Sequence, residues 1–203
     1  MSNKTTVQVV AIVVVVVFAV GILMTGGNLK PQWLRFYTIA VFLATLALAF
    51  WDRFLWHISP FQRSKWVSRD LRGSWKGKLS SNWIDPQTGR PQPPKTVFLV
   101  IRQTSNSISV ILLSDESRSR SSLARVSPDD ISALDYMYLN RPTNSIEHRS
   151  RIHHGSTSLE VIGNPATRLK GHYWTDRDSR GEIDFKSRVS LLAGDYESAK
   201  RMF

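Results

Sequence analysis

The sequence contains no cysteine. A disulfide framework is therefore excluded, together with iron–sulfur clusters, thiolate metal sites and thiol chemistry. Acidic residues are also scarce, because 16 Asp and Glu stand against 27 Lys and Arg, which gives a formal net charge of +11. A basic excess of this size favours an anionic partner.

The sequence also lacks the short motifs of the common enzyme classes. It has no glycine-rich phosphate loop, no Gly-x-Ser-x-Gly nucleophile elbow and no His-Glu-x-x-His zinc helix. His148, His153 and His154 lie beside Arg149 and Arg151, which is a poor setting for a cation. We therefore predict a non-enzyme with no catalytic residue, no metal site and no cofactor.

Long apolar runs are confined to the first 56 residues. Residues 7–24 contain Gln8 as their only clearly polar side chain and would extend about 27 Å as a helix, enough to cross a bilayer. Residues 36–51 form a second run, which reaches spanning length once its interfacial flanks are included. We therefore predict transmembrane helices at about 7–24 and 34–55.

The segment between the two runs, residues 25–31, is too short to return across the bilayer, so a hairpin with a short periplasmic loop is predicted. Basic residues are more numerous after the second run than in the loop: Arg53, Arg63, Lys65, Arg69 and Arg72 against Lys30 and Arg35. This asymmetry places both termini in the cytoplasm. A cleaved signal peptide is the alternative for the first run, but the weakly basic start and the immediate second run argue against it.

Small residues form a stripe along the second predicted helix. Ala40, Ala44 and Ala47 recur at i, i+4 and i+7, which places them on one face. Small side chains let helices approach closely in a membrane, so we predict that this face serves transmembrane packing. Alanine is also common enough in such helices to form the stripe by chance.

After residue 56 the pattern changes to short strand-like pieces separated by turn clusters, which indicates an antiparallel sandwich or barrel. The predicted strands are residues 71–80, 96–103, 107–114, 121–126, 133–139, 157–162, 168–175 and 182–189. Closure of the sheet removes its edges, so the predicted fold is mainly β, an eight-stranded antiparallel β-barrel preceded by the transmembrane hairpin. The predicted domains are residues 1–56 for the helices, 57–70 for a basic juxtamembrane linker, 71–192 for the barrel and 193–203 for a C-terminal tail.

Arginine and aromatic residues occur together in the strand-rich part. The set comprises Trp75, Trp83, Tyr136, Tyr138, Tyr173 and Trp174 with Arg102, Arg141, Arg149, Arg151, Arg177 and Arg180. Guanidinium groups pair with phosphate oxygens and flat rings stack on bases, so this mixture suits a nucleotide. Ordinary roles are also open to these residues, since aromatics in strands usually pack in the core and surface arginine attracts anionic lipid.

Short motifs at both ends of the strand-rich part resemble those of a bacterial effector family. The part opens with Gly-Ser-Trp-Lys-Gly-Lys-Leu at 73–79 and closes with Gly-His-Tyr-Trp at 171–174 and Arg-Gly-Glu-Ile-Asp-Phe at 180–185. With two N-terminal spans, the chain resembles the two-transmembrane, β-barrel effectors of cyclic-oligonucleotide-based anti-phage signalling (CBASS). The Gly-x-Trp opening is also similar to that of lipocalin-type barrels, so the barrel is expected to be lipocalin-like.

The resemblance implies a multi-pass protein of the bacterial inner membrane whose cytosolic barrel senses a cyclic dinucleotide. A partner nucleotidyltransferase would make this messenger after phage infection. Binding would lead to homo-oligomerisation and disruption of the lipid bilayer, ending in cell death or growth arrest. Long nucleic acid is not an expected partner.

Seven residues are predicted to contact the ligand. Trp75, Tyr136, Tyr138 and Tyr173 are predicted as stacking platforms or pocket walls, and Arg102, Arg151 and Arg180 as phosphate partners.

Two other functions remain open, a membrane-tethered carrier of a lipid or hydrophobic ligand and a barrel that serves as a docking adaptor. Arginine and aromatics on the inner face would favour the nucleotide receptor, an aliphatic cavity the carrier, and a fully packed interior the adaptor.

Overall fold

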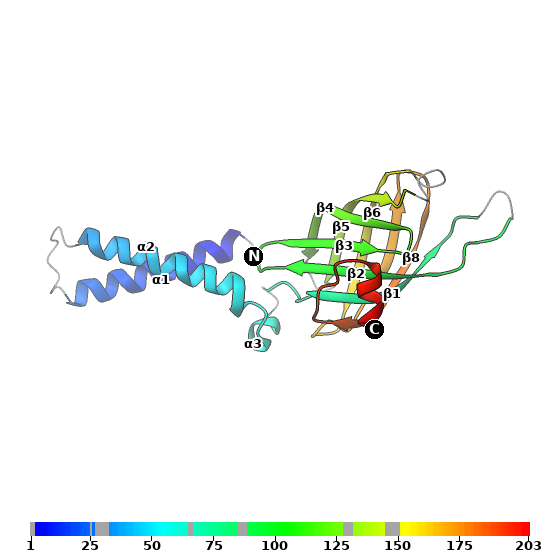
Figure 1. The fold of residues 1–203 in the computed structure, drawn as a ribbon. Helices are drawn as coiled ribbons and strands as arrows, with labels where there is room; N and C mark the ends of the chain where they lie inside the picture. The colour runs from blue at the N-terminus through cyan, green and yellow to red at the C-terminus, as the bar shows by residue number, and fades with distance from the viewer. Residues whose placement is uncertain are drawn as a thin grey trace. The chain divides into compact units, whose positions relative to one another are not determined.

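The computed structural model describes residues 3–24, 26, 33–64, 67–84, 89–127, 132–144 and 151–203. The chain divides into two compact units, Met1–Phe61 and Gln62–Phe203. The first unit is helical and the second consists mainly of strands (Figure 1). The change from helix to strand thus follows the change in composition along the sequence.

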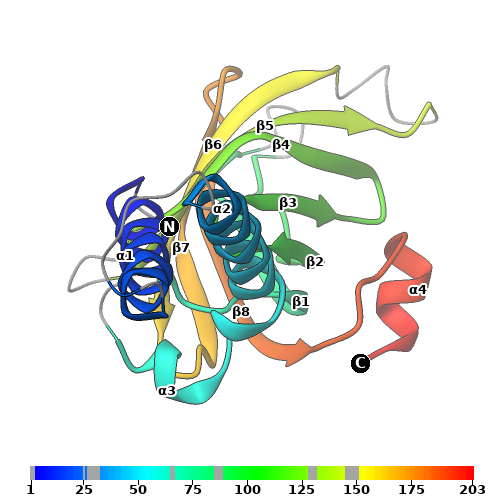
Figure 2. The same ribbon diagram turned by 90° about the vertical axis from the view of Figure 1, so that its left-hand side faces the viewer.

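The helical unit is a hairpin. Its two long helices, α1 (Asn3–Met24) and α2 (Trp33–Phe50), lie side by side and run in opposite directions (Figures 1 and 2). A π-helical turn, η1 (Trp51–Leu55), continues α2, and a short helix, α3 (Ser59–Gln62), follows. Most of the predicted periplasmic loop lies outside the described residues.

The described helices differ in their capacity to span a membrane. The helix over Tyr37–Leu55 is long and apolar enough to cross, whereas Val10–Met24 is apolar but shorter. One candidate span is therefore found where the sequence predicts two. The exposed side chains of these helices are mostly large and apolar, as a lipid-facing surface requires.

The alanine stripe of α2 faces inward within the hairpin. Ala40 and Ala44 are buried and Ala47 is half-buried. On α1, Gly21 is also buried. Because α1 is the helix that packs along α2 in this unit, these small residues lie in the contact between the two helices of one chain. Any packing between hairpins of different copies would therefore use another face.

The second unit is a closed barrel of eight antiparallel strands in sequence order, with β8 pairing back onto β1. Its strands are β1 (Gly73–Ser81), β2 (Lys95–Gln103), β3 (Ile108–Leu113), β4 (Ser117–Ser127), β5 (Ala133–Pro142), β6 (His153–Ile162), β7 (Arg168–Thr175) and β8 (Arg180–Val189). The predicted eight-stranded antiparallel barrel is confirmed.

Two strands begin four residues earlier than the sequence predicts. β4 begins at Ser117 rather than 121, and β6 begins at His153 rather than 157. Residues 117–121 read Ser-Arg-Ser-Arg-Ser and carry no apolar alternation, so nothing local marks a strand. The ladder with β5 continues there, and the Ser119 Oγ donates to Asn140 Oδ1 across the pair at 2.7 Å.

The continuous apolar run of β2 is explained by burial on both faces. Val97, Leu99 and Ile101 point into the barrel. Phe98 and Val100 point outward and are covered by the C-terminal segment with its helix α4 (Tyr196–Arg201). A strand buried on two sides has no alternation, which is why its inner face could not be assigned from sequence.

The barrel interior changes character along its axis. At the connector end, where the chain enters β1 through Leu71, the buried residues are apolar: Leu71, Trp75, Ile101, Val126, Leu134, Val161, Leu169 and Phe185. At the loop end, near the β7–β8 hairpin of residues 176–179, they carry polar atoms: Ser119, Tyr136, Tyr138, Asn140, His153, Thr157 and Tyr173. The loop end is therefore the half of the barrel that is chemically equipped to recognise a polar ligand.

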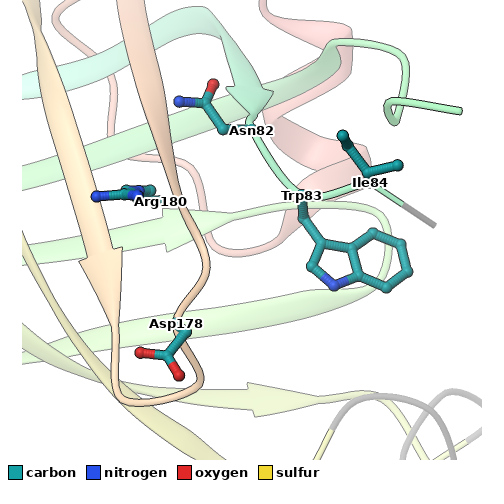
Figure 3. Close-up of a pocket in the computed structure, with 5 residues that line it drawn as sticks. All are labelled: Asn82, Trp83, Ile84, Asp178 and Arg180. Carbon is teal, nitrogen blue, oxygen red and sulfur yellow. The ribbon is translucent and has the colours of Figure 1, made fainter. Parts of the chain in front are cut away.

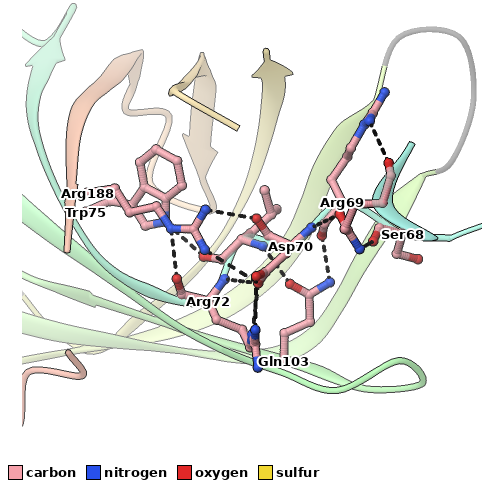
Figure 4. A network of polar contacts seen from close by, with 9 residues as sticks. Ser68, Arg69, Asp70, Arg72, Trp75, Gln103 and Arg188 are labelled. Atoms are coloured by element: carbon pink, nitrogen blue, oxygen red, sulfur yellow. Dashed lines mark hydrogen bonds and ion pairs between the residues drawn. The ribbon is translucent and has the colours of Figure 1, made fainter. Parts of the chain in front are cut away.

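At the connector end, Arg188 joins the segment before β1 to the barrel wall (Figure 4). Its Nε donates to Arg72 O at 2.9 Å and its Nη1 donates to Asp70 O at 3.0 Å. Its guanidinium carbon lies 5.2 Å from the centre of the Trp75 ring, a cation–π contact. The Trp75 indole N–H donates to Leu71 O at 2.9 Å. Both the ring and the indole N–H of Trp75 therefore make contacts that close the connector end of the barrel.

The Asp70 carboxylate holds the same network together. It accepts from Arg72 Nε at 2.9 Å and from Arg72 Nη2 at 3.0 Å, and Arg188 Nη2 lies 3.5 Å away. Burial acts to raise the pKa of Asp70, but the hydrogen bonds and charge of Arg72, with the charge of Arg188, outweigh it and hold that pKa below its ordinary value. The ionised carboxylate therefore stabilises the folded barrel.

The stability of the barrel should depend on the ionisation of Asp70. The pKa of Asp70 is lower in the folded chain than in the unfolded chain, where it is about 3.9. The ionised carboxylate therefore stabilises the fold at pH values above about 3.9, and this stabilisation is lost as the pH falls through the folded-state pKa. We expect Asp70→Asn to lower the thermal midpoint at about pH 7 and to reduce the loss of stability between about pH 5 and pH 2. Calorimetry of both full-length proteins measures this difference. Asp184, whose pKa is also lowered, is present in both, so identical pH profiles would contradict the prediction.

Candidate functional site

A surface pocket lies at the loop end of the barrel (Figure 3). Its volume is about 440 Å³, and it is lined by Asn82, Trp83 and Ile84 from the segment after β1 and by Asp178 and Arg180 from the β7–β8 hairpin. Ligand pockets have volumes of about 300–1,000 Å³, so this one is in the ordinary range.

Backbone hydrogen bonds position both sides of the pocket. Asn82 N donates to Arg180 O at 2.8 Å, which extends the β1–β8 pairing to the pocket rim. In the hairpin, Thr175 N donates to Ser179 O at 2.9 Å, and the two hydroxyls lie 2.7 Å apart. Asp178 adopts a left-handed backbone conformation with φ 58°, which Asp tolerates better than most residues. The hairpin tip is therefore a tight, defined turn.

The pocket lining combines the groups that a nucleotide requires. The Trp83 side chain is 40% exposed, so much of its ring is free to stack. Arg180 is exposed and offers a guanidinium group that suits a phosphate. Asp178 supplies carboxylate oxygens that can accept hydrogen bonds from the amino group of a base. A base and a phosphate can thus be contacted at one place.

The predicted tyrosines lie inside the barrel at the same end. Tyr136 pairs with Thr157, and Thr157 pairs with Tyr173 across neighbouring strands. Tyr138 follows on β5 with its ring centre 5.9 Å from that of Tyr136. Gly155 pairs with Tyr138, whose hydroxyl end occupies the space that a Cβ at residue 155 would need. A tyrosine layer therefore lines the interior behind the loop end.

Burial makes these tyrosines weaker acids than an exposed tyrosine, which is already neutral at pH 7. It raises the pKa of Tyr136 to about 12, although the Thr157 hydroxyl partly offsets the effect. It also raises the pKa of Tyr138, where the neighbouring Tyr136 and Tyr173 add to the shift, and the pKa of Tyr173. The hydroxyls of Tyr136 and Thr157 are fully buried and make no hydrogen bond of good geometry with the described residues. Neutral phenols line the interior without repelling an anion.

The structure separates the seven predicted ligand residues into two groups. Tyr136, Tyr138 and Tyr173 lie in the loop-end interior, Arg180 lines the pocket, and Arg151 is exposed just before β6 at the same end. Trp75 and Arg102 belong to the connector end, where Trp75 is buried in the core and Arg102 is exposed on the outer face of β2. Those two residues lie away from the pocket.

Of the five residues that line the pocket, only Arg180 belongs to the predicted ligand set; Asn82, Trp83, Ile84 and Asp178 were missed. Trp83 is the aromatic residue among those missed. It follows β1 and precedes the proline-rich segment, so it lies outside the strands that build the core. An aromatic residue beyond the end of a strand is not needed for core packing. That position beyond the end of β1 is the signal that could have identified Trp83.

The described residues contain no group of three or more His, Asp or Glu placed to hold a metal ion. No curated protein matches the sequence. A model of the family described as Cap15, cyclic dinucleotide receptor domain, matches residues 68–187, which is more than half of the chain and covers β1 to β7 with most of β8. The chain therefore belongs to the Cap15 family of cyclic dinucleotide receptors, effectors of CBASS anti-phage signalling.

Proposed function

We propose that this protein is a membrane-anchored CBASS effector in which a cyclic dinucleotide binds at the loop end of the barrel and triggers self-assembly that disrupts the inner membrane. The observation that carries the proposal is the pairing of Trp83 and Arg180 in one pocket of a cyclic dinucleotide receptor domain. The hairpin supplies the membrane contact through Tyr37–Leu55. The basic residues that follow the hairpin favour a barrel in the cytoplasm, which is the compartment where the messenger would be made.

The location of the arginines favours binding at the rim over binding deep inside. Among the described residues, the buried polar side chains are Gln, Ser, Asn, His and Thr, and none is arginine. Exposed arginines such as Arg180 and Arg151 are therefore the candidates for the phosphate contacts. The loop-end tyrosines would then form the floor beneath a ligand held at the mouth.

The packed connector half argues against a carrier with an aliphatic cavity. Trp75, Phe185 and the aliphatic residues around them are fully buried in one continuous cluster. Because these residues are apolar and closely packed, a polar ligand would have to be recognised at the loop end. A docking role is compatible with a packed interior, and it would use the outer surface rather than the pocket.

Ligand binding can drive assembly only through a difference in affinity between the single and the assembled states. A shift from 1:99 to 99:1 requires about 5.5 kcal/mol of such preference. Each copy in an assembly adds its own ligand and contacts, and the membrane confines the copies to two dimensions. Modest preferences at each barrel can therefore accumulate until the bilayer fails.

The proposal predicts direct binding of a cyclic dinucleotide to the full-length protein. Purified protein in detergent is titrated with a panel of cyclic dinucleotides that contains every pairing of adenine, guanine and uracil. We expect heat of binding and a rise in thermal midpoint with at least one member, because a ligand that binds only the folded state stabilises it. Linear dinucleotides of the same bases are the control. No heat and no shift with any cyclic member would contradict the proposed ligand.

A further inference from the structure

A second exposed tryptophan lies next to the pocket arginine. Trp174 on β7 pairs with Arg180 on β8, so the two side chains leave neighbouring strands on the same outer face of the barrel. Directly paired residues have Cβ atoms about 4.5–5.5 Å apart. Trp174 is 51% exposed, whereas Tyr173, which precedes it in the chain, points into the core. Core packing therefore does not account for an indole at this position.

Arg180 lies between the two tryptophans at the rim of the barrel. On its other side, Asn82 N donates to Arg180 O at 2.8 Å, and Trp83 follows Asn82 and lines the pocket. The order across β7, β8 and the end of β1 is therefore Trp174, Arg180 and then Trp83. These strands are neighbours in a barrel of eight, so the wall turns by only about one-eighth of a circle from one strand to the next. One small ligand can reach all three residues.

A carboxylate accompanies each tryptophan. Asp178 lines the pocket together with Trp83 (Figure 3). Glu182 on β8 pairs with His172 on β7, two residues before Trp174. Glu182 is thus the diagonal neighbour of Trp174, within reach of a group that lies on its ring. Glu182 is exposed, and across the described part of the chain it has no ion-pair partner.

We propose that Trp174 and Glu182 form a second base site, so that the ligand straddles Arg180 with one base on Trp83 and the other on Trp174. This inference rests on the proposed function. A cyclic dinucleotide carries its two bases on opposite sides of a sugar–phosphate ring, which suits two aromatic platforms separated by a guanidinium group. Stacking stabilises each base, and Arg180 pairs with a phosphate of the ring.

The two carboxylates give the site a preference among bases. Carboxylate oxygens accept hydrogen bonds and cannot donate them. Adenine and guanine carry an exocyclic amino group that donates, whereas uracil has one ring N–H flanked by two carbonyl oxygens, which a carboxylate repels. Purines also offer a larger face for stacking. The expected ligand is therefore a cyclic dinucleotide of two purines, followed by the mixed purine–uracil members, with the two-uracil member weakest.

Alanine substitution tests the second stacking platform. Full-length protein in detergent is titrated calorimetrically with the panel of cyclic dinucleotides. Trp174→Ala should weaken binding of the tightest member roughly 5- to 150-fold, and Trp174→Phe should keep most of the affinity. Met137→Ala removes an apolar side chain of similar exposure from β5 and should leave affinity unchanged. Binding by the Trp174→Ala variant as tight as by the Met137→Ala variant would overturn the inference.

Combining the two tryptophan variants shows whether the rings contact different bases. In the Trp83→Ala/Trp174→Ala protein the two losses of affinity should multiply, because rings that contact different bases act independently. Thermal midpoints of the unliganded variants report folding. A folded double variant that binds as well as the weaker single variant would place both rings on one base and overturn the second site.

Base preference tests the carboxylate. Glu182→Gln should reduce the ratio of affinities for two-purine and two-uracil ligands by about tenfold, because an amide lacks the charge and can also donate to uracil. Glu160→Gln makes the same change at an exposed glutamate of β6 near the connector end and should leave the ratio unchanged. A natural protein that prefers the two-uracil ligand, or a ratio that Glu182→Gln does not alter, would overturn the assigned role of Glu182.

The same titrations separate this inference from the proposed function. Binding that depends on Trp83 and Arg180 but not on Trp174 would overturn the second base site and leave the receptor function standing. No binding of any cyclic member by the natural protein would contradict the proposed function and the second base site together.

Discussion

Replacing Trp83 by alanine is expected to weaken cyclic dinucleotide binding by roughly 5- to 150-fold, the effect of losing one stacked base. Arg180→Ala is expected to have a similar effect, because a charge-assisted hydrogen bond contributes about 1.5–3 kcal/mol. Both side chains line the pocket and neither belongs to the barrel core. Calorimetric titration of the full-length variants with the cyclic dinucleotide that binds best measures both effects.

Two matched controls accompany these variants. Trp83→Phe keeps an aromatic face and should retain most of the affinity. Arg102→Ala makes the same change as Arg180→Ala at another exposed arginine, on β2 near the connector end, and should leave affinity unchanged. If Arg102→Ala weakened binding as much as Arg180→Ala, the ligand would have to bind near the connector end or through general charge attraction, and the pocket assignment would be wrong.

Deleting residues 1–56 is expected to abolish growth arrest in cells that express the protein with a messenger-producing nucleotidyltransferase. The deleted part contains both apolar helices, including the candidate span Tyr37–Leu55. The barrel unit begins only at Gln62 and keeps its own core. Colony counts and entry of a membrane-impermeant dye measure the effect, and full-length protein should give far fewer colonies and more dye entry than the deletion variant.

A second variant separates tethering from membrane damage. In it, residues 1–56 are replaced by one unrelated transmembrane helix, so the barrel stays at the membrane without its own hairpin. We expect this variant to bind the ligand and to leave the cells growing. Arrest that persists without any membrane segment would contradict the mechanism, since the barrel alone would then be toxic.

Local patterns in the sequence determined the class of fold. The apolar runs in the first 56 residues have the length and composition of α1 and α2. Alternation in residues 182–186, where Ile183 and Phe185 face inward, together with the turn clusters, indicated eight strands and a closed sheet. These features depend on neighbours within a few residues, so they are visible in one sequence. β4 and β6 were predicted too short because their first residues are held by pairing with β5 rather than by their own pattern.

Only the tertiary structure decided which residues meet. Trp75 and Trp83 are both tryptophans near arginines in the strand-rich part, and only Trp75 was predicted to contact the ligand. Closure of the barrel buries Trp75 completely beneath Arg188 and leaves Trp83 exposed at the rim beside Arg180. The pocket joins segments nearly 100 residues apart, and their approach depends on β8 pairing with β1. The burial of Trp75 and the approach of Trp83 to Arg180 depend on the strand pairing that closes the barrel, and no local sequence pattern encodes that pairing.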